Sequence, residues 1–282
     1  MWIDITSHAP DVDWVKAATP ALFEKKIQKK RPGTISVCAA LQFKYGIDCV
    51  PHLLCRGFSV EETEDSLIDL HYLGIRNILA IRGDGDIHVE NPKNPGFESH
   101  LYATDLLQQI SNLREGIYLH QKAEPMKFCT GIGFYPEKHF ESPNQSFGLQ
   151  ILQKKSLLGA EYGISQMFFE NQFFHDFVNR ANAVTQMPLI PGIKILTKSS
   201  QLSMVPSRFF VDIPEAFSNQ MFATEDGKKQ KKIGIDWAFH QCVDLIEAGH
   251  SHLHFYILQD ATPLHILLDR LLDHYPSRFR KQ

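Results

Sequence analysis

The stretch Gly74-Ile75-Arg76-Asn77-Ile78-Leu79-Ala80-Ile81-Arg82-Gly83-Asp84 decides the fold that the sequence predicts. We expect a helix to end at Gly74, and the apolar run from Ile78 to Ile81 is typical of a buried parallel strand. The strand leads directly into Arg-Gly-Asp, and in α/β proteins ligands bind at the carboxyl ends of strands. An ordinary βα turn with a solvated ion pair has the same pattern, so the polar residues at the other strand ends must decide between the two interpretations.

The composition is typical of a soluble globular protein that can bury a sizeable core. The chain has 282 residues, of which 43% are hydrophobic and 22% are charged. The net charge of −3 gives no reason to expect a nucleic-acid partner, and no apolar run approaches the roughly 18 residues that a membrane span needs. The amino terminus has no signal-like segment, and the five cysteines are widely spaced, which indicates reduced thiols. We therefore expect a cytoplasmic protein.

Strands and helices are expected to alternate along most of the chain. The expected strands are residues 2–6, 48–55, 78–81, 127–135, 164–169, 188–193 and 253–258. Thr34 is a candidate cap for a helix that runs to about Tyr45, and Ser59-Val-Glu-Glu62 is a capping-box pattern that begins the next helix. Further helices are expected from about residue 98, up to Gly159, after residue 170, and over 236–248 and 263–274.

Two segments are expected to contain little regular structure. Residues 10–32 are polar and punctuated by prolines, and their basic run could bind phosphate, although a solvated loop or helix face explains it more simply. Residues 198–231 are expected to form short helices and a charged loop around Asp226-Gly-Lys-Lys-Gln-Lys-Lys.

Three glycines indicate a repeating unit. Gly74, Gly159 and Gly249 each follow an expected helix shortly before a strand, as in repeated βα units. Seven such strands predict an α/β fold, a (β/α)8 TIM barrel in one domain over residues 1–282 that is one strand short. A doubly wound open sheet would also accept seven strands, but the chain has no Gly-x-Gly-x-x-Gly fingerprint for a Rossmann domain.

The motifs, in their order along the chain, resemble the methylenetetrahydrofolate reductase family of FAD-dependent (β/α)8 barrels. The resemblance spans about residues 2–258 and rests on Ile3-Asp-Ile-Thr6, His52-Leu-Leu-Cys55, Arg82-Gly-Asp84, Tyr135-Pro-Glu-Lys-His139, Gln166-Met-Phe-Phe169, Pro191-Gly-Ile193 and Leu253-His-Phe-Tyr256. Each motif alone is weak, and the ordered set carries the resemblance.

The resemblance implies an enzyme in which NADH or NADPH gives a hydride to FAD, which then reduces 5,10-methylenetetrahydrofolate to 5-methyltetrahydrofolate. Asp84 matches the carboxylate that stabilises positive charge developing on the folate. Gln166 matches the amide that hydrogen-bonds the pterin ring, although a polar residue capping a strand would look the same.

The resemblance also implies a set of residues that hold FAD. They are Thr6, His52, Arg82, Gly83, Asp84, Tyr102, Ala103, Tyr135, His139 and Lys155. An extended dinucleotide needs a partner for its ring and cations for its pyrophosphate, and Tyr135 with Arg82 and Lys155 can supply these. Taken alone, each has a structural explanation, since a histidine such as His52 after an apolar strand is usually a satisfied core residue.

The chain departs from the family pattern at several positions. The family's first strand, of the Glu-Phe-Phe-Pro-Pro type, carries a glutamate that acts as general acid, and nothing before Thr6 matches it. Gly148 replaces an aspartate near the cofactor, Ser199 lies where a ring-stacking aromatic is common, and Asp260 lies about where some members have an arginine. The changes at Ser199 and Asp260 concern the substrate site rather than flavin binding.

Other interpretations stay open at this point. A catalytically silent flavin- or folate-binding subunit that works with a partner chain is the main alternative, and an unrelated barrel enzyme with its site at the same rim is another. His250, His252 and His254 raise a zinc hypothesis, but His254 already fits the last strand motif, so no metal is predicted. We expect no appended regulatory domain, and a homo-oligomer is possible.

Overall fold

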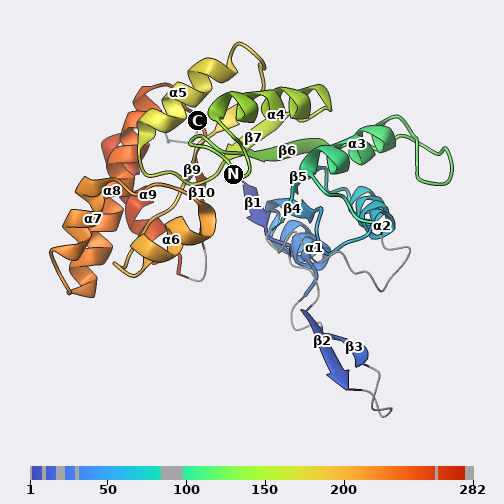
Figure 1. The fold of residues 1–282 in the computed structure, drawn as a ribbon, viewed down its shortest axis with the longest axis horizontal. Coiled ribbons are helices and arrows are strands. Elements are labelled where there is room, and N and C mark those ends of the chain that lie inside the picture. Colours follow the sequence, from blue (N-terminus) through green and yellow to red (C-terminus); the bar gives the residue numbers. More distant parts are fainter. Residues whose placement is uncertain are drawn as a thin grey trace. The chain divides into compact units, whose positions relative to one another are not determined.

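The computed structural model describes residues 2–7, 11–16, 23–28, 32–83, 98–257 and 260–276, with only the backbone of 11–16 and 23–28. The chain divides into two compact units (Figure 1). The first comprises Met1–Gly133 and Lys154–Glu161, and the second comprises Phe134–Gln153 and Tyr162–Gln282.

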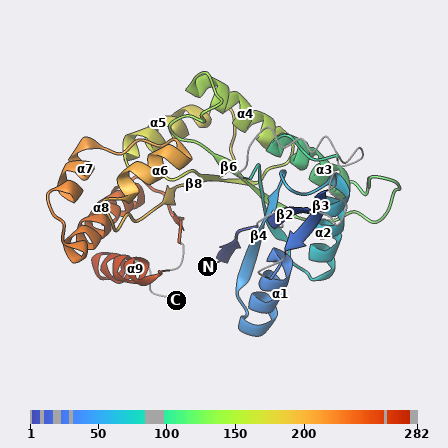
Figure 2. The ribbon, with the colours of Figure 1, turned by 60° about the horizontal axis from the view of Figure 1, so that its bottom comes forward.

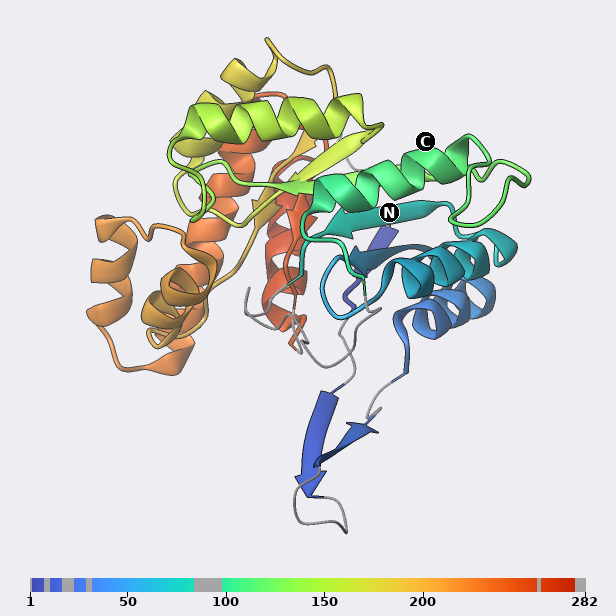
Figure 3. The ribbon, with the colours of Figure 1, turned by 45° about the vertical axis from the view of Figure 1, so that its right-hand side comes forward.

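The first unit is built on parallel strands in the order β1-β4-β5-β6. Its elements are β1 (Trp2–Ile5), β2 (Asp11–Lys16), β3 (Phe23–Gln28), α1 (Thr34–Tyr45), β4 (Asp48–Leu54), α2 (Val60–Tyr72), β5 (Asn77–Ile81), α3 (Ala103–Arg114) and most of β6 (Cys129–Phe134). Helices α1 and α2 lie side by side (Figure 3). The central strand β5 is buried over Ile78, Leu79 and Ala80, which explains its uninterrupted apolar sequence.

The second unit contains two short parallel strand pairs, β7 with β8 and β9 with β10. Its elements are β7 (Tyr162–Ser165), α5 (Asn171–Ala181), β8 (Leu189–Ile190), β9 (Gly192–Ile193), α6 (Gln201–Phe209), α7 (Glu215–Phe222), α8 (Gly227–Glu247), β10 (His254–Phe255) and α9 (Thr262–His274). Helix α4 (Gln145–Leu157) has residues in both units. A buried cluster that includes Met167, Phe169 and Phe217 lies against Trp237 of α8.

The predicted α/β class, with parallel strands that alternate with helices in the manner of a (β/α) barrel, is confirmed. Gly74, Gly159 and Gly249 follow helices α2, α4 and α8 with φ of 69°, 90° and 97°. Only glycine adopts such angles without strain, which is why these residues mark the βα repeat in the sequence.

The structure corrects several boundaries. Residues 11–16 and 23–28 form an antiparallel pair of strands where we expected a loop, because β-formers such as Val12, Trp14 and Val15 outweigh the polar composition. The charged segment after Asp226 is the beginning of α8 rather than a loop, since the Asp226 carboxylate caps the helix by accepting the Lys228 N–H at 2.8 Å. Strand β7 ends at Ser165, four residues earlier than predicted.

Two helix starts also differ from the prediction. Helix α3 begins at Ala103 instead of near residue 98, and Gly33, not Thr34, occupies the cap position of α1. The Thr34 hydroxyl instead donates to the carbonyl of Thr6 at 3.3 Å, so it joins α1 to the end of β1. Residues 85–96 are rich in Asp, Asn, Pro and Gly, which predicts a loop, and they lie outside the described residues.

We predict that Ser59→Ala lowers the free energy of unfolding by about 1 kcal/mol, because it removes half of a complete capping box. The Ser59 hydroxyl accepts the Glu62 N–H at 3.0 Å, and the Glu62 carboxylate accepts the Ser59 N–H at 2.8 Å. Urea titration followed by circular dichroism measures the loss. Ser66→Ala is the matched control, since that hydroxyl bonds only a carbonyl within α2, at 2.7 Å, and alanine favours helix. Equal losses in both variants would contradict the capping argument.

Candidate functional site

In the first unit, a cation and an aromatic ring lie at the end of β5. Arg82 and Gly83 directly follow the strand, and the Arg82 guanidinium lies 5.0 Å from the centre of the Tyr102 ring. Tyr102 is 52% exposed and precedes α3, where its N–H donates to the Asp105 carboxylate at 2.9 Å. The structure therefore brings together Arg82, Gly83, Tyr102 and Ala103 of the predicted cofactor set. Asp84 lies outside the described residues.

His52 on β4 presents a buried nitrogen that nothing in the described part of the chain hydrogen-bonds. Its Nε2 lies 3.9 Å from a carboxylate oxygen of Asp4, beyond hydrogen-bond distance. A buried polar atom without a partner is costly, and in native proteins it is commonly satisfied by a ligand or water. This nitrogen fits the ligand contact that the resemblance to the family predicts for His52. Thr6 lies exposed just after the neighbouring strand β1.

Lys155 of α4 places its ammonium inside the first unit. Its Nζ donates to the Gly133 carbonyl at 2.7 Å, and no other hydrogen bond of this ammonium involves a described residue. Burial lowers the pKa of Lys155 to about 8, although the nearby Cys55 thiol acts in the opposite direction. An anionic ligand group beside it would restore the charged form.

In the second unit, Gln166 is the first residue after β7. Its backbone N–H donates to the Phe134 carbonyl at 2.7 Å, and its side-chain oxygen accepts the Met167 N–H at 3.0 Å. The side-chain NH₂ has no hydrogen-bond partner among the residues that the structure describes, so it is available as a donor. The Met167 N–H therefore holds the side-chain amide of Gln166 at the end of the strand.

Two further predicted residues contact each other after β6. The rings of Tyr135 and His139 lie 4.6 Å apart in an edge-to-face arrangement. His139 Nδ1 accepts the Glu141 N–H at 3.2 Å, which leaves the other ring nitrogen to act as the donor. Tyr135 and His139 thus form one aromatic cluster in the second unit.

Glu137, between these two residues, was not assigned a role from the sequence. One carboxylate oxygen accepts the Asp212 N–H at 2.9 Å, and the other is buried with no hydrogen-bond partner in the described ranges. Burial raises the pKa of Glu137 to about 7, against the effect of the Asp212 N–H. A carboxyl group that is partly protonated at neutral pH can donate a proton or a hydrogen bond. The only signal in the sequence was its position directly after an apolar strand.

A pocket of about 120 Å³ lies at the carboxyl ends of β9 and β10. Its polar lining comes from Lys194, Thr197, Gln201 and Asp260. Lys194 donates to the Tyr256 carbonyl at 3.0 Å, and burial lowers the pKa of its ammonium. The prediction from the sequence missed Lys194, although it directly follows the Pro191-Gly-Ile193 motif.

Tyr256 and Gly192 join this pocket to the end of β7. The Tyr256 hydroxyl donates to the Ser165 carbonyl at 2.7 Å, and the Gly192 N–H donates to the Ser165 hydroxyl at 2.8 Å. A Cβ at Gly192 would lie 2.4 Å from the Ser165 carbonyl oxygen and 2.6 Å from the Tyr256 ring, so only glycine fits. Because Gln166 follows Ser165, the pocket and the predicted folate-binding amide belong to one connected rim.

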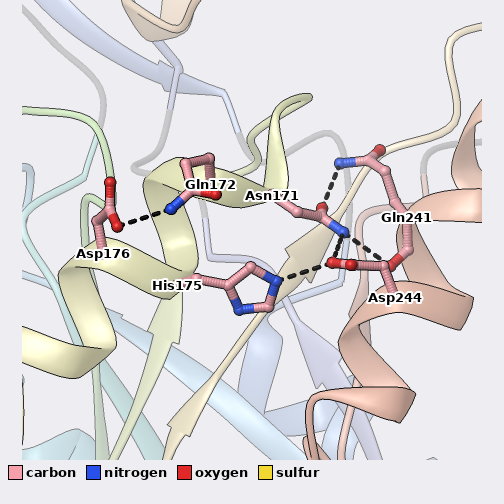
Figure 4. Close-up of polar contacts among 6 residues, drawn as sticks. All are labelled: Asn171, Gln172, His175, Asp176, Gln241 and Asp244. Carbon is pink, nitrogen blue, oxygen red and sulfur yellow. Dashed lines mark hydrogen bonds and ion pairs between the residues drawn. The ribbon is translucent and has the colours of Figure 1, made fainter.

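Helices α5 and α8 fix the chain that follows Gln166. The Gln241 amide donates to the Phe168 carbonyl at 3.2 Å and the Trp237 indole donates to the Phe169 carbonyl at 3.0 Å. Figure 4 shows the adjoining network, in which the Asp244 carboxylate accepts from Asn171 at 2.6 Å and lies 2.8 Å from His175 Nε2. This network holds the two helices together beside the rim.

The histidines considered for zinc do not converge. His250 lies near His175 and Phe174, whereas His254 contacts Tyr256. Within the described ranges, no group of three or more His, Cys, Asp or Glu residues could hold a metal ion. In the same ranges, no helix is both long and apolar enough to cross a membrane.

Comparison with known proteins decides the family. The methylenetetrahydrofolate reductase family model matches residues 10–271. The chain belongs to this family. It is 30% identical over 241 residues to "Methylenetetrahydrofolate reductase 2" of Saccharomyces cerevisiae, covering 83% of this chain and 38% of that protein. It is also 30% identical over 234 residues to "5,10-methylenetetrahydrofolate reductase" of Buchnera aphidicola, covering 81% of this chain and 73% of that protein.

A solved structure shares the fold. It is described as an uncharacterized protein from Clostridium thermocellum that binds two copies of 5-methyl-5,6,7,8-tetrahydrofolic acid. The TM-score is 0.50 at 12% identity, and the match covers 82% of this chain and 77% of that one. The chain spans about two fifths of the yeast relatives and about three quarters of the bacterial relatives that it matches.

We predict that Glu137 makes stability depend on pH between about 4.5 and 7. Its pKa is raised from 4.5 to about 7 in the folded protein, so the folded state binds the proton more tightly than the unfolded state. Its contribution to stability is therefore fully present below pH 4.5 and is lost as the pH rises through 7. Compared with Glu137→Gln, the unmodified protein should lose on the order of 1 kcal/mol over this range, reduced from the full shift by its partial exposure.

Urea titrations at pH 5 and pH 7.5 measure this difference. Glu225→Gln is the control for the loss of one carboxylate, because Glu225 is exposed in the same unit. A difference between Glu137→Gln and the unmodified protein that is the same at both pH values would refute the buried-carboxyl argument.

Proposed function

We propose that this chain reduces 5,10-methylenetetrahydrofolate to 5-methyltetrahydrofolate, with FAD as the hydride carrier and NADH or NADPH as the donor. The family match over residues 10–271 carries the proposal. The polar groups at the strand ends support it, because they are the kinds of group that a dinucleotide and a pterin need. A cytoplasmic location is a further part of the proposal and comes from the composition, whereas a possible homo-oligomer comes from the resemblance to the family.

The residues of the first unit fit FAD. The buried nitrogen of His52 lacks a partner in the described part of the chain, and the Lys155 ammonium has only one hydrogen bond there. Arg82 and Lys155 would neutralise the pyrophosphate, and the exposed ring of Tyr102 would cover a flat part of the cofactor. The resemblance to the family also assigns Thr6, Gly83, Asp84 and Ala103 to FAD, together with Tyr135 and His139 of the second unit. When bound, FAD supplies the two-step transfer of hydride from the nicotinamide to the folate.

The residues of the second unit would bind and protonate the folate. The Gln166 NH₂ group, which has no hydrogen-bond partner among the described residues, would donate to the pterin ring. The hydrogen bond from the Met167 N–H to the Gln166 side-chain oxygen fixes where the amide points, and the bond from the Gln166 N–H to Phe134 fixes the backbone. The resemblance to the family adds Asp84, which is not part of the second unit and would stabilise positive charge that develops on the substrate during hydride transfer. Glu137 is the described carboxyl group whose pKa, at about 7, suits proton donation at neutral pH.

A binding subunit without catalysis is the second candidate function. It is favoured by Asp260, because some family members have an arginine at about this position. The Asp260 carboxylate lines the pocket and pairs with Lys231 at 3.5 Å. Ser199 also favours it, because it brings no aromatic ring to the substrate site and its N–H donates to Gln230 at 3.1 Å.

The two candidates predict different results in one spectroscopic experiment. The purified chain, loaded with FAD, is mixed anaerobically with NADH or NADPH and then with methylenetetrahydrofolate. We expect the flavin absorbance to bleach with the nicotinamide and to recover with the folate. Bleaching without recovery would favour the binding subunit, and a chain that cannot be loaded with FAD would refute both flavin-based functions.

We predict that Gln166→Leu raises the KM for the folate about tenfold and leaves flavin reduction by the nicotinamide unchanged. The loss of one hydrogen bond to the pterin accounts for a change of this size. Steady-state assays give the KM, and anaerobic stopped flow gives the flavin reduction rate. Gln172→Leu is the control, since it removes the same amide from the surface of α5, where it bonds Asp176 at 2.8 Å (Figure 4). A fall in the flavin reduction rate with an unchanged KM would contradict the assigned role.

A further inference from the structure

A row of aromatic rings runs from the segment after β6 to the end of α6. The ring centres of His139 and Phe140 lie 4.5 Å apart with their planes at 32°, and those of Phe140 and Phe210 lie 4.6 Å apart with their planes at 26°. The three rings are therefore close to parallel, and all three residues belong to the second unit. Phe140 and Phe210 are 48% and 54% exposed, so the row ends in an exposed, flat apolar surface.

Phe210 holds a backbone conformation that a bulky residue rarely adopts. Its φ of 56° and ψ of 45° lie in the left-handed region, where the residue ends helix α6. Glycine or asparagine usually occupies this position of a helix end, because a larger side chain is unfavourable there. In the described part of the chain, Phe210 is the only residue other than glycine with a positive φ. Strain of this kind is typical of ligand-binding sites, so the ring needs an explanation.

The hydrophobic core supplies the neighbours of Phe210 but does not explain its ring. Val211 belongs to the buried cluster of the second unit, and Phe209 and Ile213 pack against that cluster. Phe210 and Asp212 alternate with these residues and are exposed on the short connection between α6 and α7 (Figure 2). The core therefore fixes the backbone on both sides of Phe210 while the ring itself stays at the surface.

The two segments that carry the rings are joined at two points. The Glu137 carboxylate accepts the Asp212 N–H at 2.9 Å, and Phe140 stacks on Phe210. Lys138 and Asp212, one from each segment, are exposed and form no ion pair with any residue that the structure describes. Beside the rings they offer a cation and a hydrogen-bond acceptor to a ligand.

This set of groups is complementary to an adenine nucleotide. Adenine has a flat ring that stacks on aromatic side chains and an amino group that donates to an acceptor such as Asp212. The nucleotide phosphate can pair with a cation such as Lys138. A phosphate placed on the rings themselves would be repelled by the neighbouring Asp212 carboxylate, so the rings suit the base.

We propose that Phe140 and Phe210 form a stacking site for the adenine ring of a bound dinucleotide, either FAD or the nicotinamide donor. The inference rests on the proposed function, which requires both dinucleotides. The exposed pair of rings would then favour dinucleotides over mononucleotides, and the unfavourable backbone of Phe210 would be the cost of presenting its ring to the ligand.

The variant Phe210→Gly tests the proposal because it removes the ring and relieves the backbone at the same time. FAD and FMN are titrated into the FAD-free chain and followed by flavin fluorescence. ADP-ribose is titrated by calorimetry into the chain with and without FAD. We expect the variant to bind FAD or ADP-ribose about tenfold more weakly. It should bind FMN as the unmodified protein does, because FMN has no adenine.

Stability separates a binding role from a structural one. Urea titrations of Phe210→Gly and Phe210→Asn should show unfolding midpoints that are not lower than that of the unmodified protein, since both residues tolerate the left-handed conformation. Phe140→Ala should weaken adenine binding as Phe210→Gly does. Phe222→Ala is the matched control, because Phe222 is a 67% exposed phenylalanine at the end of α7 in the same unit. The control should keep every affinity.

The two titrations identify the source of the adenine ring. Weaker binding of FAD alone assigns the site to the flavin cofactor, and weaker binding of ADP-ribose assigns it to the nicotinamide donor. Unchanged affinities in both titrations would overturn the proposal. An equal loss for FMN and FAD, or lower urea midpoints in both Phe210 variants, would do the same.

The outcomes for this site and for the proposed function are distinguishable. A chain that binds adenine through Phe210 without reducing the folate would support the site and refute the reductase. Folate reduction together with unchanged adenine affinities in Phe210→Gly would refute the site alone. A chain that binds neither FAD nor ADP-ribose would refute both.

Discussion

The second unit depends on the close approach of β7, β9 and the end of β10. The Ser165 backbone and hydroxyl receive hydrogen bonds from Tyr256 and Gly192, and a side chain at Gly192 would collide with both neighbours. This contact fixes where Gln166 leaves the end of β7 and where Lys194 leaves β9. The pocket wall and the predicted folate-binding amide are consequently positioned by one packing constraint, which local helix or strand propensity does not supply.

Both units leave buried polar atoms with few or no hydrogen-bond partners among the described residues, which is energetically unfavourable without a ligand. His52 Nε2 and one oxygen of Glu137 lack hydrogen-bond partners in the described residues, and the ammonium groups of Lys155 and Lys194 each have one. Burial moves the pKa of each charged group toward its neutral form. Such groups would be expensive in an ordinary core, so each of them is a candidate for contact with a ligand within its own unit.

The sequence predicts the local features of this fold well, and burial poorly. The capping box at Ser59 and the glycines that end helices are local, because each follows from the backbone geometry of a few residues. The antiparallel pair of β2 and β3 is not predicted, because the polar composition of residues 10–32 hides the β-formers that they contain. Glu137 and Lys194 were missed because their unusual environments come from residues distant in the chain, such as Asp212 and Tyr256. The likeness to the family identified Gln166, but only the structure gives its hydrogen bonds.

The topology also explains why Lys231, near the start of α8, pairs with Asp260 of the pocket at the ends of β9 and β10. In a βα repeat, a helix that precedes a parallel strand begins at the carboxyl end of that strand, the end where ligands bind. Lysines placed at the start of α8 must therefore face the same rim as Lys194 and Asp260, however far apart they are in the sequence. The cost of gathering cations at the positive end of a helix is then understandable. From the start of α8, side chains that do not belong to the strands can reach a ligand bound at the carboxyl ends of the strands.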